Sequence, residues 1–357
     1  MIYESSVRNE VKTVCAVVVT YNRKELLLEC LSALLKQTRP VQAIYIIDNY
    51  STDGTSQMLM KMRYISQLPP EDISQPWENQ SEVNNLVDSK TVTIYYVRMN
   101  SNIGGAGGFY EGVKRAYQKG YDWLWLMDDD AEPRSDALKE LANYFGDDKI
   151  SALAGTVTLP DGSICFSHRG TIDFSETFPL LQKPLKPGNY NKPYVDIDMA
   201  SFVGILINRK AIEKVGYPKK EFFIHHDDVE YCIRLRQVGR ILLIPSSIIF
   251  HKEAAKSIGV QKTFLGRKSV CIPYEKLWIT YYGNRNIIWL GKKYSTRKVR
   301  FYLSIFKNGV KSIIKILIYD DNKMKRIRFV INYYLDGLKG RFDNEKPKKI
   351  LYSSYTM

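Results

Sequence analysis

Residues 14–47 read VCAVVVTYNRKELLLECLSALLKQTRPVQAIYII, and this stretch decides the fold class. Its first seven residues form a β-branched apolar run, which predicts a buried strand. Leucines at 26, 27, 31, 34 and 35 then recur on one helical face, and residues 41–47 predict a second strand. A strand, a helix and a strand in succession form a βαβ unit, which requires parallel pairing. The chain is therefore predicted to be an α/β protein.

The same alternation continues along the chain. Strands are predicted at residues 92–97, 123–127, 153–158, 202–208, 241–244 and 248–251. Helices are predicted at residues 24–36, 109–118, 135–145, 210–215 and 227–238. Residues 64–91 and 160–200 are polar or rich in Pro and Gly, and we expect both to be irregular. The overall expectation is a mostly parallel, Rossmann-like sheet flanked by helices.

The positive charge of the chain is confined to one end. The 357 residues carry 52 Lys and Arg against 38 Asp and Glu, a net charge of +14. Residues 284–357 hold 18 Lys and Arg against 5 Asp and Glu, so +13 of that charge lies there. A nucleic-acid enzyme would carry its positive charge in a groove of the body, so no nucleic-acid partner is expected. We predict a catalytic domain over residues 1–270 and a helical, basic module over 271–357.

Cysteine usage and the lack of long apolar runs indicate the compartment. The five cysteines are an odd number without CxxC spacing, so neither a disulfide framework nor a zinc site is expected. Residues 1–13 contain no signal-peptide core, and no apolar run approaches the roughly 18 residues that cross a bilayer. We therefore expect a cytoplasmic protein. None of these features predicts an oligomeric state.

Three consecutive carboxylates, Asp128, Asp129 and Asp130, follow the apolar strand predicted at 123–127. Open α/β sheets bind ligands at this end of their strands. Because alternate side chains point the same way, Asp128 and Asp130 should face one ligand together. Their oxygens suit Mg2+ or Mn2+ holding a diphosphate. A solvated turn or a helix cap is the alternative.

A second acidic pair, Asp227 and Asp228, begins a predicted helix after the apolar and aromatic run FFIHH. A carboxylate at the lip of a buried pocket is what a general base requires. The alternative is that both residues only cap the helix. His251, one of four histidines, ends the strand predicted at 248–251, which is the position of a site residue.

The glycine-rich segment NIGGAGG at residues 102–108 follows a predicted strand. Glycines let the backbone approach a ligand and direct its amides at phosphate or sugar oxygens. The segment does not match a dinucleotide fingerprint, because Tyr110 stands where GxGxxG needs Gly. A tight turn with close helix packing is the alternative. Residues 20–23 and 48–49 follow two neighbouring strands and would complete the same rim.

Together these motifs resemble the inverting glycosyltransferases of the GT-A class known as family 2. The turn TYNR at 20–23 matches the nucleotide-binding turn of that family, and DNYSTDG at 48–54 matches its D-N-x-S-x-D-G segment. The acidic triplet matches its metal and diphosphate motif. Within the family, NIGGAGGF with the triplet, the acidic pair and a later His resembles bacterial galactofuranosyltransferases. The resemblance covers residues 14–255.

The resemblance implies a role for each matching residue. Asp48 would contact uracil, Asp130 and His251 would bind Mn2+ or Mg2+, and Asp228 would be the general base. The remaining donor-binding residues would be Thr20, Tyr21, Asn22, Arg23, Asn102, Gly104, Gly105, Asp128 and Asp129. The acceptor would be bound by His226, Asp227, Trp278 and Arg285. Arg285 belongs to the motif Tyr281-Tyr282-x-x-Arg285-Asn286 of such transferases, for which an amphipathic helix with one paired Arg is the alternative. One departure is His226, which stands where that group has Trp.

The resemblance further implies transfer of galactofuranose from UDP-galactofuranose to a lipid-linked glycan in bacterial cell-surface polysaccharide synthesis. The same residues would serve another donor, dTDP-rhamnose or a UDP-hexopyranose. A non-catalytic, membrane-bound scaffold with a nucleotide site is the alternative of a different class.

Residues 301–319 predict an amphipathic helix of a distinct kind. Lys307, Lys311 and Lys315 recur every four residues among Ile, Leu, Phe and Val. Such a helix can lie in an anionic membrane surface, which would place the protein on the inner face of the cell membrane. The alternative is that its apolar face packs on the body and its lysines are only solvated.

Overall fold

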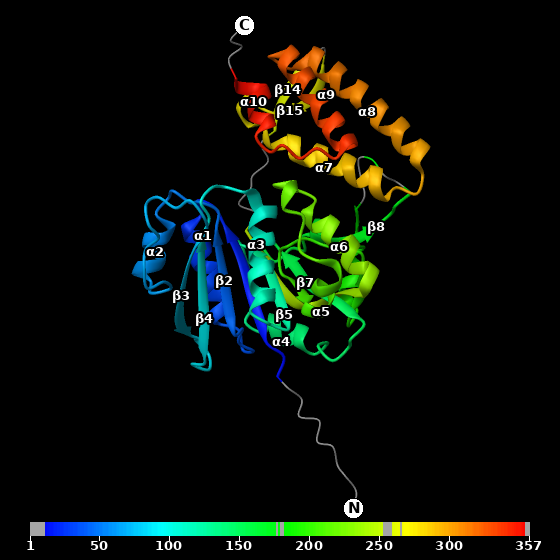
Figure 1. Ribbon diagram of the computed structural model, residues 1–357. Coiled ribbons are helices and arrows are strands. Elements are labelled where there is room, and N and C mark those ends of the chain that lie inside the picture. Colours follow the sequence, from blue (N-terminus) through cyan, green and yellow to red (C-terminus); the bar gives the residue numbers. More distant parts are fainter. Residues whose placement is uncertain (1–10, 176–177, 179–181, 253–258, 265, 354–357) are drawn as a thin grey trace, which may run out of the picture.

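The computed structural model describes residues 11–175, 178, 182–252, 259–264 and 266–353. Ten strands of this described chain form one central sheet (Figure 1). Its strands are β1 (Val14–Thr20), β2 (Ala43–Asp48), β3 (Trp77–Asn84), β4 (Thr91–Arg98), β5 (Trp123–Asp128), β6 (Ala131–Pro133), β7 (Ile150–Thr158), β10 (Val195–Ile197), β12 (Ile205–Asn208) and β13 (Arg240–His251). They lie in the order β10-β13-β7-β12-β5-β1-β2-β4-β3, and β6 pairs with β13.

The α/β class and the mostly parallel sheet are confirmed, since six of the ten strands run in one direction and four run against them. β4, β2, β1 and β5 pair in parallel, as do β7 and β13. β12 runs antiparallel to both β5 and β7, and β3, β6 and β10 also pair antiparallel. Parallel pairing needs a crossover, and the described chain between β7 and β12 contains no α-helix to make one. The sequence pattern locates β12 without giving its direction.

Helices cover both faces of the sheet, and β1 is accordingly buried at every position. Val14, Ala16 and Val18 pack into one core cluster, whereas Cys15 and Val17 pack into the cluster on the opposite face. The helices of this domain are α1 (Lys24–Leu35), α2 (Thr55–Lys61), α3 (Gly104–Gln118), α4 (Ala137–Ala142), α5 (Arg209–Val215) and α6 (Asp227–Val238). Five of these follow predicted helices, and α6 has the predicted bounds.

Four differences from the predicted elements affect the site or its surroundings. Helix α3 begins at Gly104, five residues before the predicted start, so the glycine-rich segment is its first turn. The two predicted strands at 241–251 are one strand, β13, with a register irregularity between Ile244 and Ile248. Residues 64–91 contain the edge strand β3, whose half-buried and exposed residues alternate. Residues 160–200 contain a small sheet of β11 (Met199–Ala200), β8 (Arg169–Ile172) and β9 (Gln182–Pro184).

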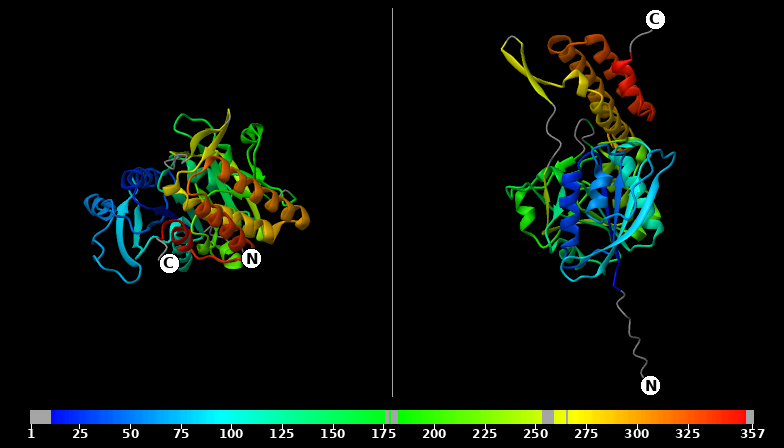
Figure 2. Two further views of the ribbon diagram at one scale, coloured as in Figure 1. Left: turned by 90° about the horizontal axis from the view of Figure 1, so that it is seen from above. Right: turned by 90° about the vertical axis from the view of Figure 1, so that its left-hand side faces the viewer.

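Residues 260–352 form a second unit with its own core. A hairpin of β14 (Val260–Phe264) and β15 (Arg267–Cys271) precedes the helices α7 (Ile279–Tyr294), α8 (Lys298–Tyr319), α9 (Lys323–Lys339) and α10 (Lys346–Tyr352). Tyr281, Phe301 and Phe329 are buried between the helices. We call this unit the C-terminal module. It stands over one end of the central sheet, and α7 lies between the sheet and the other two long helices (Figures 1 and 2).

Candidate active site

The polar residues predicted to follow the strands meet at one edge of the sheet. β1 ends at Thr20, β2 at Asp48 and β5 at Asp128, and these neighbouring strands are parallel. β13 reaches the same edge from the other half of the sheet and ends at His251, beside Ala131. The fold thereby brings His251 next to Asp130, 121 positions earlier in the chain.

A cavity of about 610 Å³ opens at this edge. Its walls combine residues from the strand ends, the first turn of α3 and the segment before α6. Predicted site residues that line it are Arg23, Gly105, Asp128, Asp130, His226, Asp227, Asp228 and His251. Two residues of the acidic triplet, the acidic pair and His251 therefore share one space.

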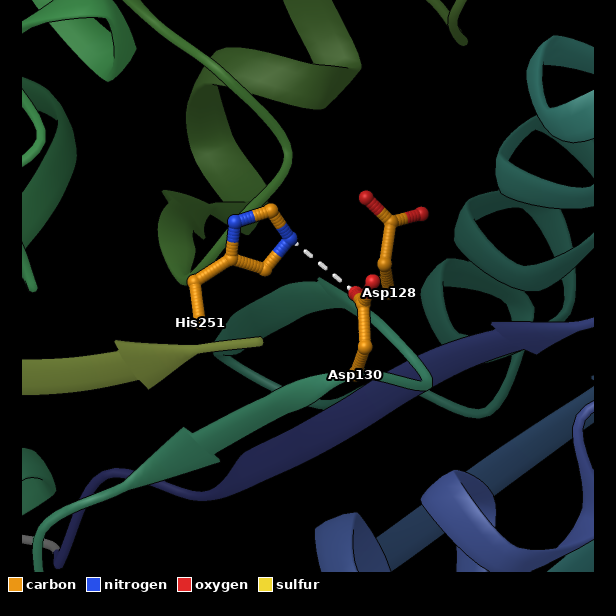
Figure 3. A group of neighbouring side chains, drawn as sticks. All are labelled: Asp128, Asp130 and His251. Atoms are coloured by element: carbon orange, nitrogen blue, oxygen red, sulfur yellow. Dashed lines mark hydrogen bonds and ion pairs between the residues drawn. The ribbon is translucent and has the colours of Figure 1, made fainter. Parts of the chain in front are cut away.

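Asp128, Asp130 and His251 form a compact cluster (Figure 3). One potential ligand atom of each lies within 4.8 Å of those of the other two. His251 Nε2 is 3.0 Å from Asp130 Oδ1, and both side chains are buried. Burial raises the pKa of Asp128 well above its usual range, and the charges of Asp130 and Asp129 raise it further. A divalent cation fits two such carboxylates and an imidazole, because it removes the repulsion between the acids.

Asp129, the middle carboxylate, does not line the cavity. Thr20 donates from Oγ1 to Asp129 Oδ2 at 2.7 Å, and Arg23 Nη1 lies 3.3 Å from Asp129 Oδ1. Burial nevertheless raises the pKa of Asp129 to about 6. The same Arg23 nitrogen is 3.3 Å from Asp130 Oδ2, so one guanidinium ties the acidic triplet to the turn after β1. Thr20 and Asp129, predicted to bind the donor, are thus placed behind the cavity wall.

Tyr21 and Asn22 also lie outside the cavity lining. Tyr21 is exposed at the surface. Asn22 adopts a left-handed backbone with φ 54° and accepts a hydrogen bond from Thr52 N at 2.6 Å through its Oδ1. Its own backbone N donates to Ser51 Oγ at 2.9 Å. Asn22 therefore joins the turn after β1 to the loop after β2, a role that its place in the motif does not reveal.

Asp48, predicted to contact uracil, is fully buried in a network of its own. Its Oδ2 accepts from Tyr96 OH at 2.7 Å and from Arg98 Nη1 at 2.9 Å, while Oδ1 accepts from Ser51 N at 2.7 Å. Arg98 in turn stacks over the ring of Tyr50, 4.7 Å from its centroid. Neither Arg98 nor Tyr50 was predicted to belong to the site. Only the position of Arg98 could have indicated it, since Arg98 ends β4 directly opposite Asp48.

The glycine-rich segment serves close packing more than ligand binding. Gly104 has φ +75°, and a Cβ there would meet Phe223 O at 2.1 Å. Asn102 Oδ1 accepts from Gly104 N at 2.9 Å, and Asn49 Nδ2 donates to Gly104 O at 2.9 Å. Gly105 differs, because a Cβ there would meet no atom within 4 Å and the residue lines the cavity. Of the three residues predicted here, only Gly105 is therefore placed to approach a ligand.

Asp227 and Asp228 begin α6 and line the same cavity. Val229 N donates to Asp228 Oδ1 at 2.7 Å. Burial raises the pKa of both carboxyl groups, and the charge of Asp228 raises that of Asp227 further. Neither forms an ion pair within the described chain. A buried carboxylate without a fixed cation beside it is suited to accept a proton.

The segment before this pair has a strained backbone. Phe223, His225 and His226 have φ of 65°, 69° and 65°, and none is glycine. Non-glycine residues in this region cost on the order of 1–3 kcal/mol each, so the surrounding structure must hold them. The strained segment is followed at once by Asp227. Its conformation therefore sets where the acidic pair lies.

Two fully buried residues of α7 hold that segment. Asn286 Nδ2 lies 3.0 Å from Phe222 O, 3.1 Å from Ile224 O and 2.9 Å from His225 O. Arg285 Nη2 lies 3.1 Å from the carbonyl oxygens of both Glu221 and Phe222. Arg285 was predicted to bind the acceptor, but it is 0% exposed and does not line the cavity. It anchors the loop instead, because its guanidinium is occupied by backbone carbonyls.

Trp278, also predicted to bind the acceptor, lies outside the cavity lining as well. Its ring packs edge-on against Tyr282, with centroids 6.0 Å apart, and Lys348 Nζ lies 4.5 Å from its centroid. Both contacts are within the C-terminal module. Tyr282 stacks in turn on Phe223 of the strained segment at 4.5 Å, so the two units are joined here by aromatic packing.

His168 lines the cavity, and the next residue, Arg169, is buried behind it. Neither was predicted to belong to the site. The ring of His168 lies edge-on to His251 with centroids 5.0 Å apart, and its Nδ1 is 2.8 Å from Ser201 Oγ. Burial, with the charge of Arg169, lowers the pKa of His168 to about 3, which keeps it neutral. Arg169 is fully buried and donates to Gly155 O at 2.8 Å and Val203 O at 2.7 Å. Both lie in the stretch predicted to be irregular, where no motif marked them.

A family model described as "Glycosyltransferase like family 2" matches residues 12–263, which contain the whole cavity edge. The chain belongs to this glycosyltransferase family. Among curated family 2 relatives, galactofuranosyltransferase GlfT1 of Mycolicibacterium smegmatis is 27% identical over 232 residues, covering 64% of this chain and 67% of the relative. GlfT1 of Mycobacterium tuberculosis is 28% identical over 236 residues, covering 64% and 66%. The dTDP-rhamnosyl transferase RfbF of Shigella flexneri is 26% identical over 266 residues, covering 71% and 81%.

Solved structures confirm the GT-A fold expected for family 2. GalNAc-T7 with UDP, GalNAc and Mn2+ aligns with a TM-score of 0.55 at 15% identity, covering 93% of this chain and 56% of that one. TarS 1-349 of S. aureus in complex with UDP-GlcNAc aligns with a TM-score of 0.53 at 12% identity, covering 95% and 87%. The match spans about two thirds of the length of the GlfT1 proteins and a little over half of GalNAc-T7.

Proposed function

We propose that this chain is a metal-dependent, inverting glycosyltransferase that transfers galactofuranose from UDP-galactofuranose to a lipid-linked glycan at the inner face of the cell membrane. One observation carries the proposal. The Asp128, Asp130 and His251 cluster and the Asp227–Asp228 pair line the same cavity. A single displacement at a sugar carbon needs both a stabilised leaving group and a base.

The donor's diphosphate would lie at the cluster. Asp128, Asp130 and His251 would hold Mn2+ or Mg2+, and the bound ion would neutralise charge that develops on the diphosphate. Arg23 would add a second positive charge from the turn after β1, since its guanidinium already lies 3.3 Å from Asp130. Gly105 leaves the adjoining wall open for the approach of the donor.

Asp228 would act on the acceptor. Val229 N holds Asp228 Oδ1, so we assign Oδ2 to the acceptor hydroxyl. As the hydroxyl oxygen bonds to C1 of the sugar, its proton passes to Asp228. The bond from C1 to the diphosphate oxygen breaks, and its electron pair leaves with UDP. Attack opposite the leaving group inverts C1, so no carboxylate nucleophile is required.

The choice of donor rests on the relatives and not on the cavity. The two GlfT1 proteins, named for galactofuranose, support UDP-galactofuranose. The second candidate donor is dTDP-rhamnose, which is favoured by the match to RfbF because that match covers more of both chains. The two donors differ in nucleotide, sugar ring and hydroxyl pattern, so one panel of substrates separates them.

The test measures nucleotide release by the purified full chain with Mn2+ and a lipid-linked acceptor extract. The panel holds UDP-galactofuranose, UDP-galactopyranose, UDP-N-acetylglucosamine and dTDP-rhamnose. UDP-galactopyranose is the matched control, because it has the same atoms and differs in ring size. We expect release from UDP-galactofuranose to exceed all others and to stop when the metal is chelated. Faster release from dTDP-rhamnose would replace the donor, and no release despite nucleotide binding would favour the non-catalytic scaffold.

A further inference from the structure

Helix α8 buries only a narrow stripe of its surface. Phe301, Ile305 and Ile316 are 0%, 5% and 6% exposed and pack in the core of the C-terminal module. Their spacings of 4 and 11 residues return to one side of a helix. The helix therefore packs through this one side. Helix α8 lies in the half of the module away from the central sheet (Figures 1 and 2).

The rest of α8 exposes an unusual amount of apolar surface. Leu303 is 65% exposed and Phe306 is 73% exposed. Six further large apolar side chains of α8 are each at least 41% exposed: Val299, Tyr302, Val310, Ile314, Leu317 and Ile318. From Val299 to Ile318 this face runs for about 29 Å at 1.5 Å per residue. Exposed apolar patches of this extent mark surfaces that contact a partner.

The same helix carries positive charge and no acidic residue. Its cations are Lys298, Arg300, Lys307, Lys311 and Lys315. Lys307 and Lys311 are exposed, and neither forms an ion pair with any residue of the described chain. On a helical projection at 100° per residue, Lys307 lies within one edge of the apolar face, and Lys311 lies just beyond that edge, between the face and Phe301. Lys315 donates to Val270 O at 2.5 Å.

We propose that this outer face of α8 docks the protein on an anionic lipid bilayer, with the apolar side chains in the interface and the lysines on lipid phosphates. An amphipathic helix with a cationic border lies in the plane of such a surface. The proposal rests on the proposed function only in that a bilayer is where a lipid-linked acceptor would be found. No helix within the described residues has the length and apolar character to cross a bilayer, and α8 itself is interrupted by its lysines.

A second copy of the chain is a poorer occupant for this face. A two-fold contact brings the same patch of each copy together. Because α8 contains no acidic residue, such a contact would set its lysines against those of the partner helix. Anionic lipid instead supplies the complementary charge, and each lysine near such a surface strengthens binding about fivefold.

The experiment is sedimentation of the full chain with vesicles of phosphatidylglycerol and phosphatidylcholine, against vesicles of phosphatidylcholine alone. We expect binding to the anionic vesicles, and we expect it to weaken as salt rises, since exposed charges are screened over about 10 Å at 0.1 M. The double variant Lys307→Gln, Lys311→Gln should weaken binding about 25-fold. The matched control is Lys61→Gln, Lys214→Gln, which removes two exposed lysines of the sheet domain and should change nothing.

The apolar half of the face is tested separately. The double variant Leu303→Gln, Phe306→Gln should bind the anionic vesicles at least tenfold more weakly. Its melting temperature should stay unchanged, because both side chains are exposed. Phe301→Gln, on the packing side of the same helix, should instead lower the melting temperature. Nucleotide release with a short soluble acceptor should be unaffected by the exposed-face variants, so failure to dock is distinguishable from failure of the proposed activity.

Three results would overturn the docking proposal. Equal binding to neutral and anionic vesicles, or none to either, would remove the electrostatic basis. A second contrary result is that the double variant Leu303→Gln, Phe306→Gln loses as much melting temperature as Phe301→Gln does. That result would mean that the exposed face is packed against another part of the protein in solution. A dimer in light scattering that Phe306→Gln dissociates would assign the face to a second copy.

Discussion

The two units of this protein handle charge in opposite ways. In the C-terminal module, the buried charges have fixed partners: Arg326 Nη2 lies 2.5 Å from Asp321 Oδ1, Asp336 accepts from Lys346 Nζ at 2.8 Å, and Arg285 donates to backbone carbonyls. Four carboxylates line the cavity of the catalytic domain, and fewer cations lie beside them. They are Asp128, Asp130, Asp227 and Asp228, and among the described residues only Asp130 pairs with a permanent cation, Arg23, while His251 Nε2 lies 3.0 Å from its Oδ1.

This difference separates charges that stabilise a fold from charges that await a ligand. A buried carboxylate costs free energy unless a cation or hydrogen bonds compensate it. In the module the compensation is internal, so its buried charges need nothing further. At the cavity the compensation is incomplete, which favours a bound cation at the cluster and a titrating group at the acidic pair.

Replacing Asp228 by Asn should reduce transfer by roughly 100-fold to 10,000-fold, because a general base contributes that much. UDP affinity should change less than about twofold, since this residue is assigned to the acceptor. Turnover and calorimetric UDP binding measure the two effects. Glu213→Gln makes the same chemical change at an exposed position of α5 and should leave both unchanged. Equal losses of UDP affinity and turnover would mean that Asp228 has a structural role and is not the general base.

Asp130→Ala and His251→Ala should each weaken Mn2+-dependent nucleotide binding by at least tenfold, because each removes one ligand of the proposed ion. Binding is measured by titrating Mn2+ at fixed UDP. His168→Gln is the matched control: its ring touches His251 but is not part of the cluster. Unaltered metal dependence in His251→Ala would show that the imidazole only packs against Asp130.

Asn286→Ala tests whether the module contributes to catalysis. Loss of its bonds to the strained segment should displace the acidic pair, and displacement of a catalytic group by about 1 Å costs on the order of 100-fold. We expect turnover to fall about 10-fold to 100-fold while UDP affinity is kept. Asn284→Ala is the control, because Asn284 donates only within α7, to Thr280 O at 2.7 Å. If both variants lost activity in proportion to their melting temperatures, the role would be stability alone.

The smallest effect concerns pH. Burial raises the pKa of Asp228 above its ordinary 3.8, and a base works only when deprotonated. Turnover at saturating donor, acceptor and Mn2+ should therefore fall about tenfold per pH unit once the pH drops below that raised pKa, while an ordinary Asp would still be ionised. A pH profile of turnover, with UDP binding measured across the same range, checks this. An acid limb near 4 would mean that the base is exposed.

The order of strands and helices followed from the sequence because local pattern reflects burial. β1, α1, β2, β5 and α6 were recognisable from apolar periodicity. The direction of β12 was not, since strand direction depends on how the chain returns to the sheet. β3 was missed because this edge strand has no fully buried position and is polar everywhere except at Trp77 and Val83, so it shows no apolar alternation.

The site residues, like the elements of the fold, were predicted only in part. Asp128, Asp130, the acidic pair and His251 do line one cavity, because each of them follows or ends a strand, or begins a helix, at one edge of the sheet. Motif position did not reveal which way each side chain turns. Asp129, Asp48 and Arg285 are turned into the protein and engaged there, so matching a motif and contacting a ligand are separate properties.

The sequence alone determined the α/β class, the chemical groups of the site and the separation of a nearly neutral body from a basic end, since these depend on composition and periodicity. Only the tertiary structure decided which of those groups meet, because His251 and Asp130 are neighbours in space and not in sequence. It also decided that the apolar side chains of α8 divide between a packed stripe and an exposed face. An amphipathic pattern gives the angle between faces but not which face a neighbouring helix covers.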